Sequence, residues 1–253
     1  GSKPWDKTGS PSSVTLLDWA NDMPWDSVRR RIYASGGRPA GDGLSCKFVY
    51  FDEATNAWAS IHNPFFGSAG GTGGSHMYDC FTLASQHGKF LAAHYTQTAI
   101  NVFDVDSLSF AGTIPFPPSG GYGGYDAVNT ITWHPTLGAQ GSIIWLNRTR
   151  WRLMRYDWAT STWSQLALDV PAGLNSHCVA VTLPNAGKVL IGNAYATAAP
   201  WGVLNVVDDS GAVTPTSQAP APISCSSSGS RGPIVAHPDG NRAIFFSYDT
   251  QRI

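Results

Sequence analysis

Seven side chains in this sequence have the types needed to bind or transform a polar ligand. An arginine can pair with an anionic or hydroxyl-rich group, and a tyrosine ring can stack on an apolar face. Histidine and aspartate can hold a metal ion or move a proton. Each of the seven lies just before, or at the start of, a predicted β-strand. They are His76, Tyr78, Asp79, Tyr125, Asp126, His177 and Arg231.

Two pairs within this set recur. A Tyr-Asp pair occurs at Tyr78-Asp79 and again at Tyr125-Asp126, and a serine precedes both histidines of the set. Recurrence favours side chains that converge on one ligand. It equally favours residues that a repeat reuses to hydrogen-bond neighbouring backbone, because buried polar groups need such partners. Ligand contact and structural support are both open for these pairs.

The elements that must position these residues come from a repeat. An apolar pair, an aspartate, a polar turn and an aromatic residue recur roughly every fifty residues, which is a period typical of repeat folds. The aspartate can cap its own turn, so each copy predicts a strand, a tight turn and a second strand. The repeated aspartates are Asp52, Asp104, Asp157 and, in a degraded copy, Asp208.

A second pair of strands is predicted before each copy, which gives four short strands per repeat. No stretch of the sequence shows the 3.6-residue period of an amphipathic helix. The sequence therefore predicts an all-β fold, a β-propeller of four-stranded antiparallel blades. The blades are expected near residues 18–60, 76–117, 125–168 and 176–220, with an incomplete fifth at 228–253. Their first strands are expected near 19–24, 77–83, 126–133, 178–183 and 232–236. Because propellers close with about four to eight blades, these four and a half are expected to belong to a larger ring or to be completed by a partner segment.

The order of these signals resembles the kelch-type β-propellers, which include galactose-oxidase-like central domains. A double glycine, Gly36-Gly37, follows a second strand, and the segment from Phe51 to Trp58 fits the pattern Tyr/Phe-Asp-x-x-Thr-x-x-Trp. Many kelch-type propellers are recognition scaffolds, so the resemblance implies a binding role. Similar propellers also occur in phage and bacterial surface proteins.

The same resemblance raises an enzymatic alternative. Galactose-oxidase-like propellers hold copper with tyrosine and histidine near the axis, and His76, Tyr78, Tyr125 and His177 have these types. No cysteine suited to a thioether stands beside a candidate ligand tyrosine. A hydrolase using Asp79 and Asp126 is a further possibility, since paired carboxylates serve that chemistry.

The composition of the chain narrows the classes of protein to which it could belong. The chain has 253 residues, 13% of them charged, and a net charge of −1, which is consistent with one domain over 1–253 and argues against nucleic-acid binding. No run of eighteen apolar residues predicts a membrane span. The four cysteines form no C-x-x-C pair; Cys80 and Cys178 are expected to be buried thiols, and Cys46 with Cys225 is a possible disulfide.

Three functional hypotheses follow. The first is a ligand-recognition module that binds a glycan or a protein partner at the mouth of the central channel, without a cofactor, on an extracellular protein or a virion surface. The second is an enzyme, a metal-dependent oxidase or a hydrolase, using the same funnel. The third is a structural subunit of a larger assembly such as a virion, or an oligomer.

Two structural expectations accompany them. Trp58, Phe110 and Trp163 follow the repeated aspartate at the same spacing and should occupy equivalent, mostly buried positions between blades. The run from Arg29 to Arg31 lies in a predicted hairpin turn and is expected to be a solvated face.

Overall fold

The computed structural model describes residues 22–36, 47–61, 80–93, 99–117, 130–147, 152–167, 178–193, 204–207, 213–215 and 234–245. Every regular element in these ranges is a β-strand, apart from two short 3₁₀ turns, η2 (Ser85–His87) and η3 (Pro184–Ala186). None of the described residues forms a helix long and apolar enough to cross a membrane. The chain divides into two compact units, residues 1–115 and 116–253.

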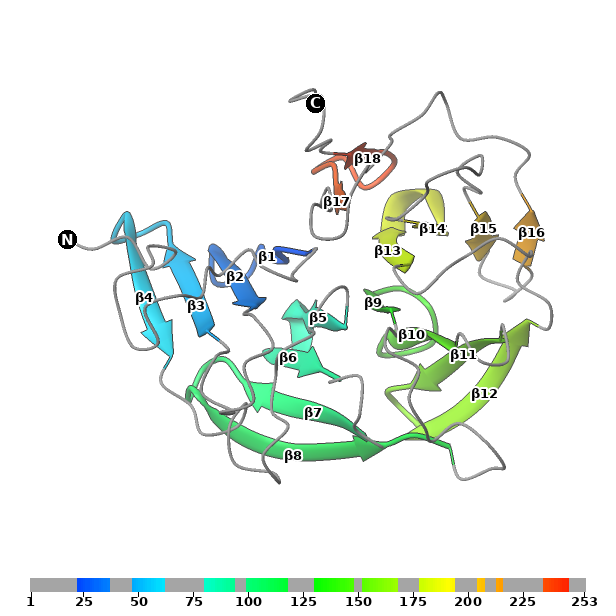
Figure 1. Cartoon of the computed structure of the whole chain (residues 1–253), viewed down its shortest axis with the longest axis horizontal. Coiled ribbons are helices and arrows are strands. Elements are labelled where there is room, and N and C mark those ends of the chain that lie inside the picture. Colours follow the sequence, from blue (N-terminus) through cyan, green and yellow to red (C-terminus); the bar gives the residue numbers. More distant parts are fainter. Residues whose placement is uncertain are drawn as a thin grey trace. The chain divides into compact units, whose positions relative to one another are not determined.

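The first unit contains two four-stranded antiparallel sheets, in which the strands follow one another in chain order (Figure 1). We call these sheets blade one and blade two. Blade one consists of β1 (Trp25–Asp26), β2 (Arg31–Gly36), β3 (Lys47–Asp52) and β4 (Ala57–Ile61). Blade two consists of β5 (Phe81–Ala84), β6 (Lys89–Ala92), β7 (Ala99–Asp104) and β8 (Ser109–Pro115).

The second unit repeats this plan in blades three and four and in the described part of blade five. Blade three consists of β9 (Thr130–His134), β10 (Ser142–Asn147), β11 (Arg152–Asp157) and β12 (Thr162–Ala167). Blade four consists of β13 (Cys178–Leu183), β14 (Lys188–Asn193), β15 (Leu204–Val207) and β16 (Val213–Pro215). Blade five is described over β17 (Ile234–Ala236) and β18 (Ala243–Phe245). The predicted four-stranded antiparallel blades are confirmed.

Aromatic rings join the two blades of the first unit. Tyr33 and Phe48 of blade one belong to the same buried cluster as Phe81, Phe90 and Phe103 of blade two. The ring centre of Phe48 lies 4.5 Å from that of Phe90 and 5.2 Å from that of Phe103. These separations suit tilted and edge-to-face ring pairs, so the interface between the blades is the core of this unit.

Aliphatic side chains play the same part in the second unit. Ile144 and Leu153 of blade three pack with Val189 and Ile191 of blade four. The first strands of three successive blades lie together, because β13 contacts both β9 and β17. The Thr132 and Thr182 hydroxyls, on β9 and β13, are 3.1 Å apart in the buried interface. The second unit is thus held together both by its first strands and by the aliphatic side chains of β10, β11 and β14.

Four of the five predicted first strands overlap the observed ones, and the described part of the first, residues 22–24, does not. Residues 22–24 form no strand, and β1 begins at Trp25. The turn after it starts at Asp26, whose carboxylate accepts the N–H groups of Val28 and Arg29 at 3.0 and 3.2 Å. This capped turn fixes the end of the strand two residues later than the sequence indicated.

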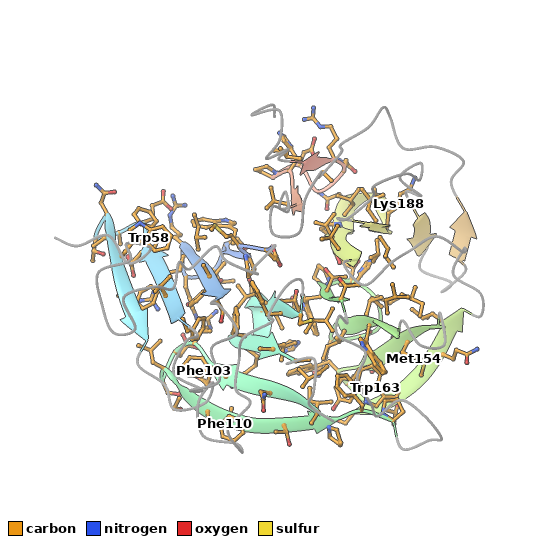
Figure 2. All side chains as sticks on the ribbon, in the orientation of Figure 1. Trp58, Phe103, Phe110, Met154, Trp163 and Lys188 are labelled. Atoms are coloured by element: carbon orange, nitrogen blue, oxygen red, sulfur yellow. The ribbon has the colours of Figure 1, made fainter. Side chains whose placement is uncertain are left out.

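The three rings that follow the repeated aspartate occupy equivalent places, as predicted. Trp58 and Trp163 pair across the hairpin with the third strands of their blades and are partly buried. Phe110 pairs with Phe103 in the same register, but it is 51% exposed, so its predicted burial is wrong. Figure 2 shows Phe110 on β8. Its cross-strand neighbour Phe103 is the ring that is fully buried, in the cluster between the two blades.

Candidate functional site

Charged and polar side chains of the described residues gather at the turns between strands. Asp52, Asp104 and Asp157, at the ends of β3, β7 and β11, each accept the backbone N–H of the residue three positions later, at 3.2, 2.8 and 3.0 Å. Asp26 caps the turn after β1 in the same way. Four positions after each aspartate the backbone is left-handed, with φ between 51° and 55°, at Arg30, Asn56, Leu108 and Ser161.

A basic side chain compensates each of the three repeated aspartates. Arg31 donates from Nε to Asp52 Oδ2 at 2.8 Å, and Lys89 pairs with Asp104. In both cases the two residues face each other across neighbouring strands. The partner of Asp157 instead comes from its own strand, where Arg155 Nη2 lies 2.5 Å from Asp157 Oδ2. The same carboxylate therefore caps a turn and forms an ion pair.

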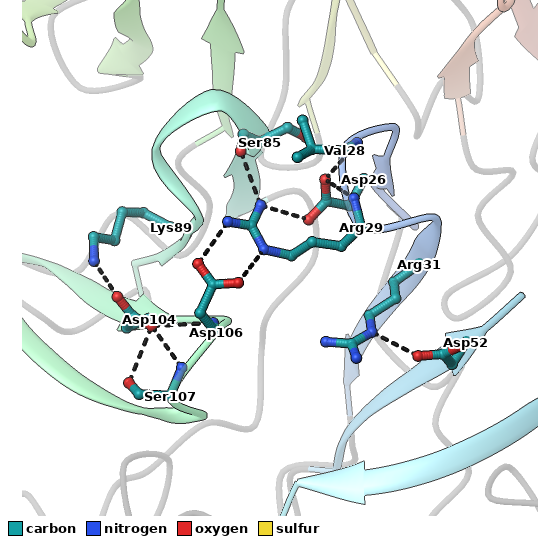
Figure 3. Close-up of polar contacts among 10 residues, drawn as sticks. All are labelled: Asp26, Val28, Arg29, Arg31, Asp52, Ser85, Lys89, Asp104, Asp106 and Ser107. Carbon is teal, nitrogen blue, oxygen red and sulfur yellow. Dashed lines mark hydrogen bonds and ion pairs between the residues drawn. The ribbon is translucent and has the colours of Figure 1, made fainter. Parts of the chain in front are cut away.

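Arg29 extends this network from blade one to blade two (Figure 3). Its Nε and Nη2 donate to the two oxygens of Asp106, at 2.5 and 2.6 Å. Its Nη1 donates to Asp26 at 3.2 Å and to the carbonyl oxygen of Ser85 at 3.0 Å. The Arg29 side chain is only 17% exposed, and that of Asp26 is fully buried. A bidentate pair of this kind fixes both distance and orientation.

Gly88 leaves the space that this guanidinium occupies. A Cβ atom on Gly88 would lie 2.5 Å from Arg29 Nη2 and 2.9 Å from Asp106 Oδ2. The φ of Gly88 is +62°, in the left-handed region that glycine adopts without a steric penalty. Its conformation closes the η2 turn, and its missing side chain leaves room for the cluster of Asp26, Arg29, Ser85 and Asp106, which we call the blade clamp.

The pKa values of Asp104, Asp106 and Arg29 are shifted in the directions that stabilise their charged forms. The hydrogen bond from Lys89 lowers the pKa of Asp104 well below its usual range, and the bond from Arg29 lowers the pKa of Asp106. The hydrogen bond to Asp106 in turn raises the pKa of Arg29. Charged groups held in this way do not exchange protons near neutral pH. The blade clamp is therefore suited to joining blades and not to acid–base catalysis.

The expectation of a solvated arginine run is wrong for Arg29. Arg30 does fit it, because its side chain is 64% exposed and pairs with Glu53. Arg29 instead turns toward blade two, and its partner Asp106 lies 77 residues away in the sequence. In the sequence, the run of three arginines is the one feature that points to this contact. Only the structure selects which of three successive arginines faces the neighbouring blade.

The turns that follow the first strands of neighbouring blades contact each other in both units. In the first unit, Arg29 after β1 reaches Ser85 after β5. In the second unit, Asn185 follows β13 and contacts the turn after β17. Its side-chain amide donates to the carbonyl oxygen of Asp239 at 2.8 Å, and its backbone N–H donates to the carbonyl oxygen of Gly240 at 3.1 Å. Neighbouring first strands therefore end side by side.

One carboxyl group stands at the opposite end of a first strand. Asp22 precedes β1, is partly buried, and accepts the Met23 N–H at 2.7 Å. Burial raises its pKa to about 7. Perturbed groups of this kind concentrate at functional sites. Within the described ranges, no group of three or more His, Cys, Asp or Glu side chains could hold a metal ion.

The seven sequence-predicted site residues lie outside the described residues, and so do Cys46 and Cys225. The structure does describe the strands that they precede. Those strands are β5 for His76, Tyr78 and Asp79, β9 for Tyr125 and Asp126, β13 for His177, and β17 for Arg231.

No known family model matches the sequence, and neither does any curated protein. Among solved structures, a chain from the crystal structure of a nidogen–laminin complex is similar, with a TM-score of 0.55 and 11% identity over 92% of this chain and 74% of that one. TolB from Acinetobacter baumannii is similar with a TM-score of 0.50 and 12% identity, over 91% of this chain and 52% of TolB. Hydrazine synthase from Kuenenia stuttgartiensis is similar with a TM-score of 0.51 and 10% identity, over 89% of this chain and 55% of that one. The fold is a β-propeller. This chain spans about half the length of the TolB and hydrazine synthase chains.

Proposed function

We propose that this propeller is a ligand-recognition module that binds a protein partner or a glycan. The proposed site is the mouth of the central channel that the first strands of a propeller line. The contacting residues are those singled out in the sequence: His76, Tyr78, Asp79, Tyr125, Asp126, His177 and Arg231.

The observation that carries this proposal is the meeting of neighbouring first strands at their ends. Arg29 contacts the Ser85 carbonyl group after β5, and Asn185 contacts residues 239–240 after β17. Since these strands end together, the segments that lead into them should meet at the opposite end of each blade pair. That arrangement supports convergence of His177 with Arg231 in the second unit, and of Asp79 with Asp22 in the first.

The chemistry of the set suits recognition. Arg231 would pair with an anionic or hydroxyl-rich group of the ligand. Tyr78 and Tyr125 would each offer a ring for an apolar face together with a hydroxyl for hydrogen bonding. The likeness to a chain of a nidogen–laminin complex supports a protein as the partner, and it accords with an extracellular location. The kelch-type sequence pattern points to the same class of scaffold.

Binding measured on matched variants tests this function. The intact chain is applied to a glycan array and to a panel of extracellular proteins, and affinity for each hit is then measured in Arg231→Ala and Tyr125→Ala. We expect a loss of about tenfold or more in each, or about 1.4 kcal/mol. Arg242→Ala is the control, because Arg242 is 67% exposed and lies beyond the other end of β17. Unchanged affinity in both site variants would overturn the proposal.

The pKa of Asp22 favours an enzyme as the second candidate. A carboxyl group that titrates near neutrality is suited to general acid or base catalysis, and Asp22 leads into β1 as Asp79 leads into β5. Metal analysis of the purified chain separates an oxidase from a hydrolase. A hydrolase that uses Asp22 would lose activity in Asp22→Asn, and retained activity would exclude that role.

A further inference from the structure

Asp22 differs from the other carboxylates in the part of the chain that the structure describes. Among these residues, every aspartate and glutamate other than Asp22 forms an ion pair with an arginine or a lysine. They are Asp26, Asp52, Glu53, Asp104, Asp106, Asp157 and Asp239. For Asp22, the described residues supply one hydrogen bond, from the Met23 N–H to Oδ1 at 2.7 Å. No described cation compensates its charge.

The pKa of Asp22 agrees with this lack of a counter-ion. Burial raises it to about 7, whereas hydrogen bonds from their basic partners lower the pKa values of Asp52 and Asp104. A neighbouring cation would favour the charged carboxylate. Arg29 does not supply that charge, because its donors are committed to the blade clamp. Asp26 of the clamp is four residues away, about 13 Å along an extended chain.

The pairing of β1 with β2 brings a serine opposite this carboxyl group. The Tyr33 N–H donates to the carbonyl oxygen of the residue before β1 at 3.1 Å, which extends the pairing beyond the strand. Met23 then packs against the cluster that contains Ala34. Asp22 is the next residue in this direction, so continuing the register places it opposite Ser35, on the sheet face that carries Tyr33.

Ser35 has a hydroxyl that is free to serve Asp22. The residue is 0% exposed, and its Oγ makes no hydrogen bond within the described part of the chain. An unpaired buried hydroxyl is unfavourable, and native structures seldom keep one without a reason. Residues directly opposite each other have Cβ atoms about 4.5–5.5 Å apart, so the hydroxyl can turn to donate to the Asp22 carboxylate. Such a donor favours the charged form of the carboxyl group.

We propose that the Asp22 carboxylate binds a primary ammonium group of the ligand, and that Ser35 is the positioning residue that stabilises this carboxylate. The proposal rests on recognition at the channel mouth, and it names a lysine side chain of a protein partner as the group bound. An ammonium supplies the counter-ion that the described residues lack. Asp22 Oδ1 already accepts the Met23 N–H, which suits a compact ammonium better than the two-pronged fork of a guanidinium. Asp22 is only partly buried, so a side chain from outside can reach it.

Carbon-13 NMR of the full chain tests this by measuring the pKa of Asp22 with and without a lysine probe. The carboxyl signal is assigned by its absence from Asp22→Asn, or by its displacement in Asp22→Glu if the first variant unfolds. Nα-acetyl-lysine amide is added at constant ionic strength up to about 100 mM, about a hundredfold above a millimolar dissociation constant. The pKa of Asp22 should then fall from about 7 to about 6 or lower, because the ammonium binds the charged form.

Two controls isolate the ammonium and the carboxyl group. Nα-acetyl-norleucine amide has a similar side chain without the charge and should leave the pKa of Asp22 unchanged. The response to lysine should persist in Glu53→Gln, since Glu53 already pairs with Arg30. Ser35→Ala should raise the pKa of Asp22 in the free chain and weaken the lysine probe about threefold or more, which a purely structural role of this serine would not do.

The outcomes separate this subsite from the function on which it rests. An Asp22 pKa that the lysine probe leaves unchanged, or that the norleucine probe lowers equally, would overturn the proposal. A response to glucosamine but not to the lysine probe would overturn the assignment of a lysine. If Arg231→Ala loses affinity for its partner while Asp22 ignores the lysine probe, recognition at the channel mouth stands and the ammonium subsite is refuted.

Discussion

Removing Arg29 should destabilise the protein well beyond the cost of an ordinary surface charge. The guanidinium makes four hydrogen bonds, to Asp26, Asp106 and Ser85. Arg29→Ala removes the counter-ion of the Asp26 carboxylate, which is fully buried in the wild-type structure. It keeps the two turn N–H groups that cap it.

The magnitude follows from burial at the two ends of the blade clamp. Breaking a buried ion pair costs about 3–5 kcal/mol, but an exposed pair is worth about 0–1 kcal/mol. The side chain of Asp26 is 0% exposed, whereas that of Asp106 is 64% exposed. Because one partner is buried and the other is solvated, we expect Arg29→Ala to lower the free energy of unfolding by about 2–3 kcal/mol.

Urea denaturation of Arg29→Ala beside Arg30→Ala measures this cost. Arg30 is the next residue, and its pair with Glu53 is exposed on both sides, at 64% and 42%. Its removal should cost less than about 1 kcal/mol. The slope of unfolding free energy against urea should be unchanged in both variants, since the exposed surface differs little. Equal losses in the two variants would refute the assignment of Arg29 as the link between blades.

Further predictions concern the turns. Gly88→Ala should lower the thermal midpoint more than Gly187→Ala, because both glycines have a φ of +62° but only Gly88 would place a Cβ atom against the blade clamp; equal shifts would argue against steric contact. Leu108→Asn should be neutral or raise unfolding free energy by up to about 1 kcal/mol, since asparagine accepts left-handed backbone more readily, and a clear loss by urea denaturation would show that this leucine packs internally. The pKa of Asp104 is lowered in the folded state, so its stabilisation is present above the unfolded value of about 3.9 and is lost as pH falls through the folded value. Wild type should therefore lose unfolding free energy below about pH 4 more steeply than Asp104→Asn, and identical acid titrations would contradict the ion pair with Lys89.

The repeated turns could be predicted from sequence because their chemistry is local. Asp52, Asp104 and Asp157 cap turns through residues only three positions away. A short-range pattern of this kind survives in the sequence regardless of what surrounds it. The strands on either side follow from alternation and the turn, which explains why most first strands were predicted close to their observed positions.

Contacts between blades could not be predicted in the same way. The partner of Arg29 lies 77 residues away, and the sequence does not distinguish Arg29 from its two neighbouring arginines. The exposure of Phe110 likewise depends on whether another surface covers the outer strand. These properties belong to packing between repeats, which a repeat motif does not encode. The seven candidate site residues share this dependence, because their proposed convergence would depend on the placement of successive blades.

The affinity of Arg231→Ala beside Arg242→Ala tests the central claim most directly. The two arginines lie toward opposite ends of β17 in the sequence of blade five. Isothermal titration with the partner found by the arrays should give a dissociation constant about tenfold or more above wild type for Arg231→Ala, and an unchanged one for Arg242→Ala. Wild-type affinity in Arg231→Ala, or an equal loss in both variants, would contradict recognition at the channel mouth.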